Sequence, residues 1–185
     1  MTTTLKDLTK EKHTRAEKCL FVKKLLKKQL TPYQYYVYLS NQAVMYWFLE
    51  SYASGYGIFD GIEEMKRSQH MLNDLKNIEK EYGFTHPLHT KTTEQYLSYI
   101  RTISPKKERL LAHVYVRHLG DLSGGQIIKG LIPVAYTAYY DFDGNPEEIK
   151  SRFKERTSLE LAPEANKCFD FMVDFFHDLE VQFEF

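Results

Sequence analysis

The sequence predicts a single all-α domain, a bundle of about seven or eight helices. Period-two alternation of strand type is weak throughout the chain. The 185 residues contain no repeat, low-complexity tract or interdomain linker, so we expect one domain over residues 1–185. Helix-start signals recur instead, each a capping residue directly before a proline: Thr31–Pro32, Ser104–Pro105 and Asn145–Pro146.

The first half of the chain divides into three expected helices. A charged first helix is expected near the N-terminus. The next begins with Thr31 as its cap and runs to the glycines near residue 55. A third is expected from Asp60, a possible cap, to Gly83, which supplies the stop signal.

The second half continues in the same way. Residues 89–100 are a short amphipathic segment, and a long helix is expected from Ser104 as cap into a glycine-rich stretch. Asn145 caps a further helix, and the last one runs from near Pro163 to the C-terminus. The tyrosine-rich residues 133–144 fit either a helix end or an irregular connection.

Composition excludes several classes of protein. The 25 basic and 25 acidic residues cancel, which argues against a nucleic-acid-binding protein. Only two cysteines occur, without a CxxC pair, so neither a disulfide framework nor a zinc site is indicated. Neither a signal peptide nor a long apolar run is recognisable, and we expect a soluble, monomeric, cytoplasmic protein. The 15% of aromatic residues indicate an aromatic core or a site for a large flat ligand.

The segment VRHLGDLSGGQIIKG, residues 116–130, has four glycines within a helical context. Each glycine costs a helix about 1 kcal/mol relative to alanine. A helix kinked over a planar ligand would use the missing Cβ atoms, because the ligand can then lie against the backbone. Arg117, four residues before Asp121, is placed to pair with that carboxylate. The alternative is a helix–turn–helix corner with Asp121 as a cap.

The stretch HLGDLSGGQ is very similar to the signature segment of the haem oxygenases. Three further segments occur in that family's order: TKEKHTRAEK, YWFLE and EANKCFDF, at residues 9–18, 46–50 and 164–171. The resemblance extends over nearly the whole chain. It implies a helical bundle that binds haem, as cofactor and substrate, between its first helix and a kinked, glycine-rich distal helix.

The resemblance also implies a role for individual residues on the two faces of the haem. His13 matches the ligand of the haem iron, and Glu17 matches the residue that orients this histidine. Phe169 matches a residue that packs on the porphyrin. On the opposite face, the backbone of the kinked helix would contact the ring at Gly120 and Gly124, with Ser123 and Gly125 beside them.

Catalytic roles follow from the same resemblance. Asp121 matches the residue that organises ordered water for proton delivery to dioxygen. Tyr46 and Arg117 match other members of that network. His118 and Met172 depart from the family, which more often has an aromatic residue and an asparagine there. His118 would either add a titratable group near this network or face outward.

The two haem propionates require positive charge along one edge of the site. Lys6 lies two helical turns before His13 on the same face and matches a propionate contact of the family. Tyr115 matches a further residue on that side. Lys150 and Lys154, at i and i+4, match a basic pair that often contains an arginine, and Lys154 lacks the bidentate fork of arginine.

The reaction implied is oxidative cleavage of haem by O2 to biliverdin IXα, CO and Fe2+, with electrons from an external reductant, reduced ferredoxin. A bilin reductase would act downstream. The basic stretch FVKKLLKKQL, residues 21–30, is either a steering surface for ferredoxin or an ordinary solvated face. Two other functions stay open: a haem carrier or sensor without turnover, and an unrelated helical enzyme such as a thiamin-degrading protein.

Overall fold

A computed structural model describes residues 3–85 and 87–185, and within them the chain forms α- and 3-10 helices and no strand. The all-α prediction is confirmed. None of the described helices is long and apolar enough to cross a membrane. The α-helices are α1 (Leu5–Glu17), α2 (Leu20–Leu26), α3 (Pro32–Gly55), α4 (Ser68–Tyr82), α5 (Lys91–Ile103), α6 (Lys107–Lys129), α7 (Pro146–Lys154) and α8 (Ala162–Gln182). Three single 3-10 turns are η1 (Glu63–Met65), η2 (Ala138–Tyr140) and η3 (Leu159–Leu161).

Most of the expected helix boundaries are confirmed, because the local capping chemistry is present. The Thr31 side chain accepts a hydrogen bond from the Gln34 amide in a capping box, with proline as the first residue of α3. Asn145 caps α7 through the amide of Glu147. Gly83 ends α4 in the left-handed conformation, with φ of 69°.

Two expected helix starts are wrong, and both have a physical reason. The Ser104 hydroxyl donates to the carbonyl of Arg101, so it closes α5, and α6 begins only at Lys107. The stretch after Asp60 forms turns, and α4 begins at Ser68. Its start is capped from another helix, because the buried carboxylate of Glu50 on α3 accepts hydrogen bonds from the Arg67 and Ser68 amides.

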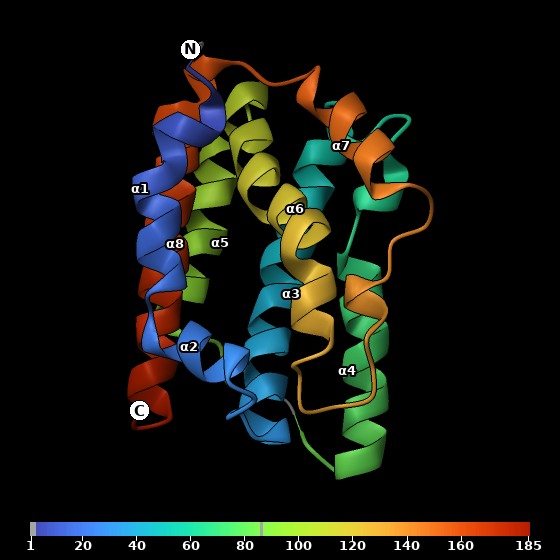
Figure 1. Ribbon diagram of the computed structural model, residues 1–185, viewed down its shortest axis with the longest axis vertical. Coiled ribbons are helices and arrows are strands. Elements are labelled where there is room, and N and C mark those ends of the chain that lie inside the picture. Colours follow the sequence, from blue (N-terminus) through green and yellow to red (C-terminus); the bar gives the residue numbers. More distant parts are fainter. Residues whose placement is uncertain (1–2, 86) are drawn as a thin grey trace.

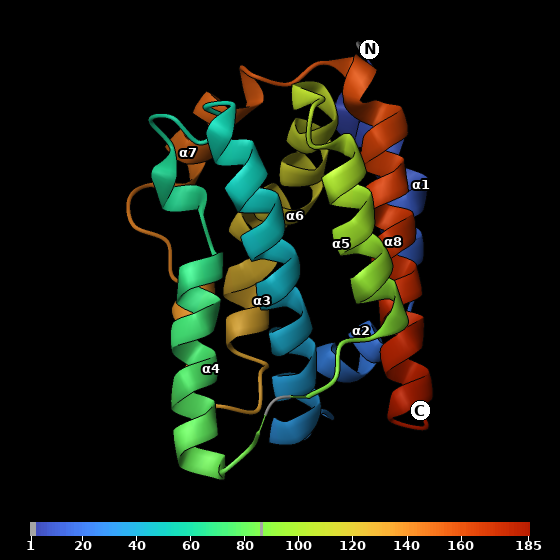
Figure 2. The ribbon, with the colours of Figure 1, turned by 180° about the vertical axis from the view of Figure 1, so that it is seen from behind.

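The helices pack in two groups around an aromatic core. The central helix α3 packs on α4, α5 and α6, while α8 packs on α1, α2, α5 and α6 (Figures 1 and 2). Fully buried tyrosine and phenylalanine rings fill the interior, including Tyr35, Tyr36, Tyr96, Phe21 and Phe175. The helices α1 and α6 are therefore held by their common neighbour α8.

A partly buried polar cluster ties α5, α6 and α8 together. The carboxylate of Glu164, at the start of α8, accepts hydrogen bonds from Arg109 Nε at 2.7 Å and Tyr99 Oη at 2.5 Å. The ring of His113 lies 3.0 Å from the same carboxylate through Nε2. Burial works against ionisation of Glu164, but these partners outweigh it and lower the pKa of the carboxyl to about 2.

Candidate functional site

Three of the four glycines of the segment, Gly120, Gly124 and Gly125, lie inside α6, which continues through them without a break and ends just before Gly130. Gly120 and Gly124 are one turn apart on the same face, and a Cβ atom added at either would meet nothing within 4 Å. Gly125 points elsewhere, since its Cβ would lie 3.1 Å from the Tyr140 ring. Two of the glycines thus leave a strip of helix backbone open, and the third makes room for core packing.

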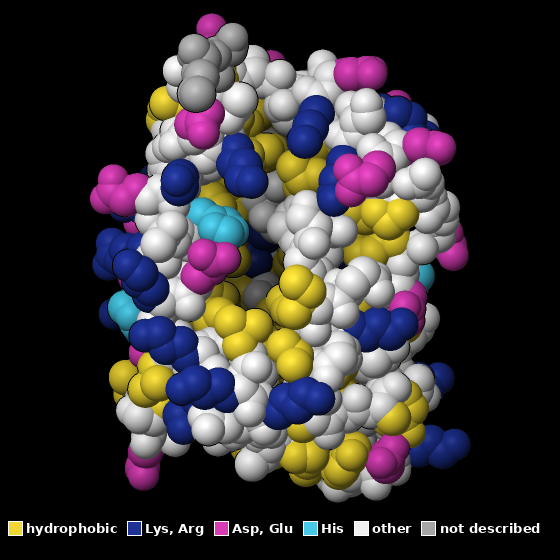
Figure 3. Space-filling view, in the orientation of Figure 1, with side chains coloured by type: hydrophobic (Ala, Val, Ile, Leu, Met, Phe, Trp, Pro, Cys, Tyr) yellow, Lys and Arg dark blue, Asp and Glu magenta, His cyan; other side chains and the backbone are white. Residues whose placement is uncertain are grey.

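The open strip faces a hollow between α1 and α6. Figure 3 shows this hollow near the middle of the molecule, with apolar side chains below it and a histidine and an acidic side chain at its edge. Ile127, one turn beyond Gly124, is 68% exposed although it is a large apolar residue. An apolar recess with bare backbone on one side suits a flat, largely apolar ligand.

His13 is carried by α1, one turn after the buried Thr9. Its side chain is 54% exposed, and Nδ1 lies 3.5 Å from Oε2 of Glu17 at i+4. The imidazole meets the Phe169 ring of α8 edge-on, with ring centres 5.5 Å apart. The structure thus brings together three residues that the sequence singled out, and leaves the imidazole accessible to a ligand.

Asp121 is fixed on α6 by two tyrosine hydroxyls from other parts of the chain. Tyr46 of α3 donates to Oδ2 at 2.6 Å, and Tyr139 of η2 donates to Oδ1 at 2.8 Å. Burial raises the pKa of the Asp121 carboxyl, although the two hydroxyls act in the opposite direction. Tyr139 is not among the residues predicted from the sequence. The only signal was the unexplained density of tyrosines in residues 133–144.

Arg117 does not form the expected pair with Asp121. Its Nη1 donates to Gln42 Oε1 at 2.9 Å and its Nε to the Tyr96 hydroxyl at 3.0 Å. The guanidinium also lies over the Tyr96 ring, 4.3 Å from its centre. Although Arg117 and Asp121 share a helix face, these partners on α3 and α5 draw the arginine side chain into the core.

His118 is fully buried and does not face outward. Its Nε2 lies 2.9 Å from Oε1 of Glu50, the carboxylate that caps α4. The imidazole also packs on the ring of Tyr46, whose hydroxyl holds Asp121, with ring centres 4.8 Å apart. Of the two alternatives for this residue, the structure favours a place close to Asp121.

The residues expected along the propionate edge are spread more widely. Lys6 is exposed on α1 and Tyr115 is half-buried on α6. Lys150 forms an ion pair with Glu147 of its own helix at 2.6 Å, and Lys154 is exposed. Since α7 lies beyond α6 as seen from α1 (Figure 1), the two groups of lysines come from opposite sides of the hollow. Ser123, also predicted, is exposed beside Gly124.

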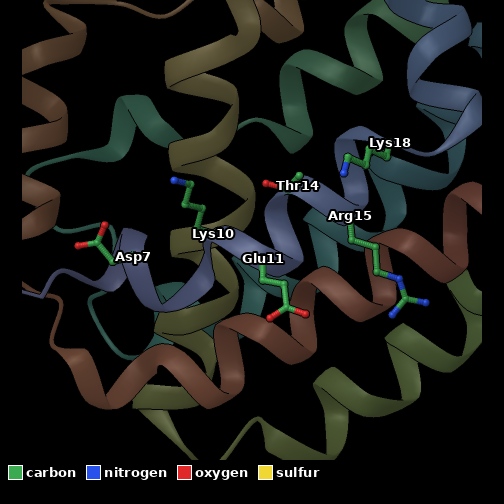
Figure 4. A pocket seen from close by; sticks show the side chains of 6 residues that line it. All are labelled: Asp7, Lys10, Glu11, Thr14, Arg15 and Lys18. Carbon is green, nitrogen blue, oxygen red and sulfur yellow. The ribbon is translucent and has the colours of Figure 1, made fainter.

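A second depression, shown in Figure 4, is lined by side chains of α1 and by Lys18, the residue that follows it. These residues recur every three or four positions and occupy the outer face of the helix, away from the stripe that carries Lys6 and His13. One convex helix face cannot enclose a ligand, so this depression is not a candidate site. The residues are Asp7, Lys10, Glu11, Thr14, Arg15 and Lys18.

Fold and site together define a helical protein with an accessible imidazole on α1, and with a strip of bare backbone and a held carboxylate on α6. The chain matches the family model described as "Heme oxygenase" over residues 1–178. It therefore belongs to the haem oxygenase family.

Individual relatives agree with this assignment. The chain is 30% identical to a heme oxygenase of Guillardia theta over 97% of its own length and 86% of the relative's. It is 29% identical to heme oxygenase 1 of Nostoc sp. over 93% and 82%.

Solved structures of the family share the fold. The structure of Synechocystis heme oxygenase-1 in complex with heme superposes with a TM-score of 0.84 at 26% identity, covering 96% of this chain and 91% of that one. The heme oxygenase of Leptospira interrogans gives a TM-score of 0.81 at 26% identity, over 93% and 96%. The family and its fold, both expected from the sequence, are confirmed.

Proposed function

We propose that this chain binds haem between α1 and the glycine face of α6, and cleaves it with O2 to biliverdin IXα, CO and Fe2+. Electrons come from an external reductant, a reduced ferredoxin. Three features of the two helices that flank the hollow support the proposal. These are the accessible imidazole of His13, the bare backbone at Gly120 and Gly124, and the held carboxylate of Asp121.

The residues fit a haem group. A side chain at Gly120 or Gly124 would project into empty space, which is the room that a macrocycle needs against the helix. The His13 imidazole is half-exposed and can offer a neutral nitrogen to iron, with Glu17 beside its other nitrogen. When bound, haem supplies both the iron centre for dioxygen chemistry and the carbon skeleton to be cleaved.

Asp121 holds and transfers protons in this proposal. Its carboxylate is oriented by Tyr46 and Tyr139, so its remaining lone pairs can accept hydrogen bonds from ordered water in the hollow. Burial raises its pKa, which makes it a stronger proton acceptor than an exposed aspartate. Arg117, fixed by Gln42 and Tyr96, keeps a positive charge in the core next to this group.

Basic residues on the two rims supply the remaining interactions. Lys6 and Tyr115 on one side, and Lys150 and Lys154 on α7, are candidates to hold the two carboxylates of haem. Their placement would set the in-plane rotation of the ring, and with it the carbon that is attacked. Four lysines of α2 and the turn after it offer a basic surface to an acidic ferredoxin: Lys23, Lys24, Lys27 and Lys28.

Hemin titration tests the binding site. We expect a Soret band that is lost or weakened in His13→Ala and restored by added imidazole, because free imidazole can replace the missing ligand. His177→Ala is the matched control, since His177 is exposed on α8, outside the proposed site. An unchanged Soret band in His13→Ala would contradict the assignment of the ligand.

Turnover tests the reaction. With reduced ferredoxin and O2, the Soret band should disappear while a bilin absorption rises, and chromatography should identify the IXα isomer. A Soret band that persists under these conditions would favour the haem carrier or sensor. A different bilin isomer would leave the reaction class intact and contradict only the proposed regiochemistry.

A further inference from the structure

We propose that Tyr139 is a positioning residue for Asp121. Its hydroxyl occupies one carboxylate oxygen while Tyr46 occupies the other, so that together they fix the orientation of the carboxylate on the helix that lines the hollow. This inference rests on the proposed function, because it concerns the proton-handling group of the same site. The geometric part of it can nevertheless be tested without haem.

The two hydroxyls reach the carboxylate from different elements. Tyr46 comes from the middle of α3 and Tyr139 from the 3-10 turn η2, and their O–O distances to Asp121 are 2.6 and 2.8 Å. Their rings meet edge-on with centres 6.1 Å apart. A carboxylate with one donor can still rotate about its Cβ–Cγ bond, whereas donors on both oxygens remove that freedom. Tyr139 therefore adds orientation that Tyr46 alone does not supply.

Tyr139 is itself held in place by α4 and the turn before it. The buried carboxylate of Asp74 accepts hydrogen bonds from the Ala138 and Tyr139 amides at 3.0 and 2.8 Å. The buried guanidinium of Arg67 donates to the carbonyls of Tyr139 and Asp141 at 3.3 and 2.5 Å. Burying a carboxylate and a guanidinium is costly. Their hydrogen bonds to this one segment give the tyrosine a fixed backbone.

The surroundings of Asp121 determine what loss of the hydroxyl would do. Burial is the main influence and raises the pKa of the carboxyl, while the hydroxyls of Tyr46 and Tyr139 lower it, as do the nearby His118 and Arg117. Removing one donor should therefore raise the pKa further. The titratable and charged groups around Asp121 are Tyr35, Tyr38 and Tyr46 of α3, Arg67 before α4, Arg117 and His118 of α6, and Tyr139 and Tyr140 of η2.

The first test measures the Asp121 carboxyl in haem-free protein by 13C NMR titration. A hydrogen bond to a charged group is strong enough that its loss in Tyr139→Phe should raise this pKa by about one to two units. Tyr140→Phe is the matched control. It removes the hydroxyl of the next residue, which is equally buried and does not bond to Asp121. Equal shifts in both variants, or none in Tyr139→Phe, would overturn the proposal.

Two further measurements complete the test. The wild-type protein should show a slowly exchanging hydroxyl proton for Tyr139 that disappears in Asp121→Ala, which removes the acceptor, and its absence from the wild type would count against the bond. With hemin loaded, the acid limb of the rate–pH profile should move upward in Tyr139→Phe by the shift found in the NMR titration. A purely structural tyrosine would lower the rate at every pH alike, which would refute the positioning role.

The two proposals fail in different ways. If the protein does not degrade haem but Tyr139→Phe alone shifts the Asp121 carboxyl, the proposed function falls and the interaction stands. If haem is degraded and the carboxyl does not respond to Tyr139→Phe, the function stands and the positioning role is wrong.

Discussion

Glu164 should make the protein sensitive to acid. This carboxylate is hydrogen-bonded to Arg109, Tyr99 and His113 at the junction of α5, α6 and α8. These partners lower the pKa of the carboxyl from 4.5 to about 2. A carboxyl with a depressed pKa in the folded state stabilises the protein fully above its unfolded pKa. That contribution is lost as the pH falls toward the folded value. The window for Glu164 is therefore pH 4.5 down to about 2.

The size of the effect follows from the two pKa values. A difference of about 2.5 units, at about 1.36 kcal/mol for each unit, corresponds to roughly 3 kcal/mol of folding free energy. The free energy of unfolding of a typical folded domain is about 10 kcal/mol, so this contribution is a large share of it. The Glu164 side chain is 12% exposed, which limits screening at the carboxylate, although the side chain of Arg109 is 35% exposed.

Urea unfolding between pH 6 and pH 2 measures this contribution. Wild-type stability should fall over that range by about 3 kcal/mol more than that of Glu164→Gln, which cannot lose a charge. Glu160→Gln provides the control, because Glu160 is exposed on the neighbouring 3-10 turn, and its curve should run parallel to the wild type. Parallel curves for wild type and Glu164→Gln would refute the argument.

Three further changes test other parts of the structure. Gly124→Ala should stabilise the haem-free protein by up to about 1 kcal/mol, because alanine favours helix and its Cβ meets nothing, yet weaken hemin binding measured by titration. Asp121→Asn should keep the Soret band of the bound haem, but it should slow haem degradation at least about tenfold in a turnover assay. Arg67→Ala should lower the free energy of unfolding by about 3 kcal/mol in urea, because buried carbonyls lose their donor.

Much of the fold could be predicted because many of its helix starts and ends are determined by residues close to them in the sequence. Thr31, Asn145 and Gly83 mark helix ends through their own side-chain or backbone chemistry, which the sequence displays directly. The start of α4 could not be predicted in this way. Its cap is Glu50, which lies on another helix, and only the packing of α3 against α4 brings the carboxylate to the amides. Tertiary caps of this kind leave no local pattern.

The candidate site also contains residues that could be predicted from the sequence and residues that could not. His13, Gly120 and Asp121 could be named because a family motif surrounds them. The family motif also predicts Arg117 as a site residue, but the predicted pairing of Arg117 with Asp121 is wrong. Spacing along one helix does not reveal that Gln42 and Tyr96, on neighbouring helices, accept the hydrogen bonds of the guanidinium. Tyr139 could not be found at all. Its contact with Asp121 spans 18 positions, and it depends on a turn clamped by α4.

The helix that presents His13 is held mainly from one side. Along α1 the side chains of Leu5, Thr9 and Ala16 are buried, and the helix packs mainly on α8, which also supplies the Phe169 ring beside the imidazole. Asp121, in contrast, is held by hydroxyls from α3 and η2. The two sides of the hollow therefore depend on different parts of the bundle, and a substitution that displaces α8 should move the imidazole while leaving the carboxylate in place.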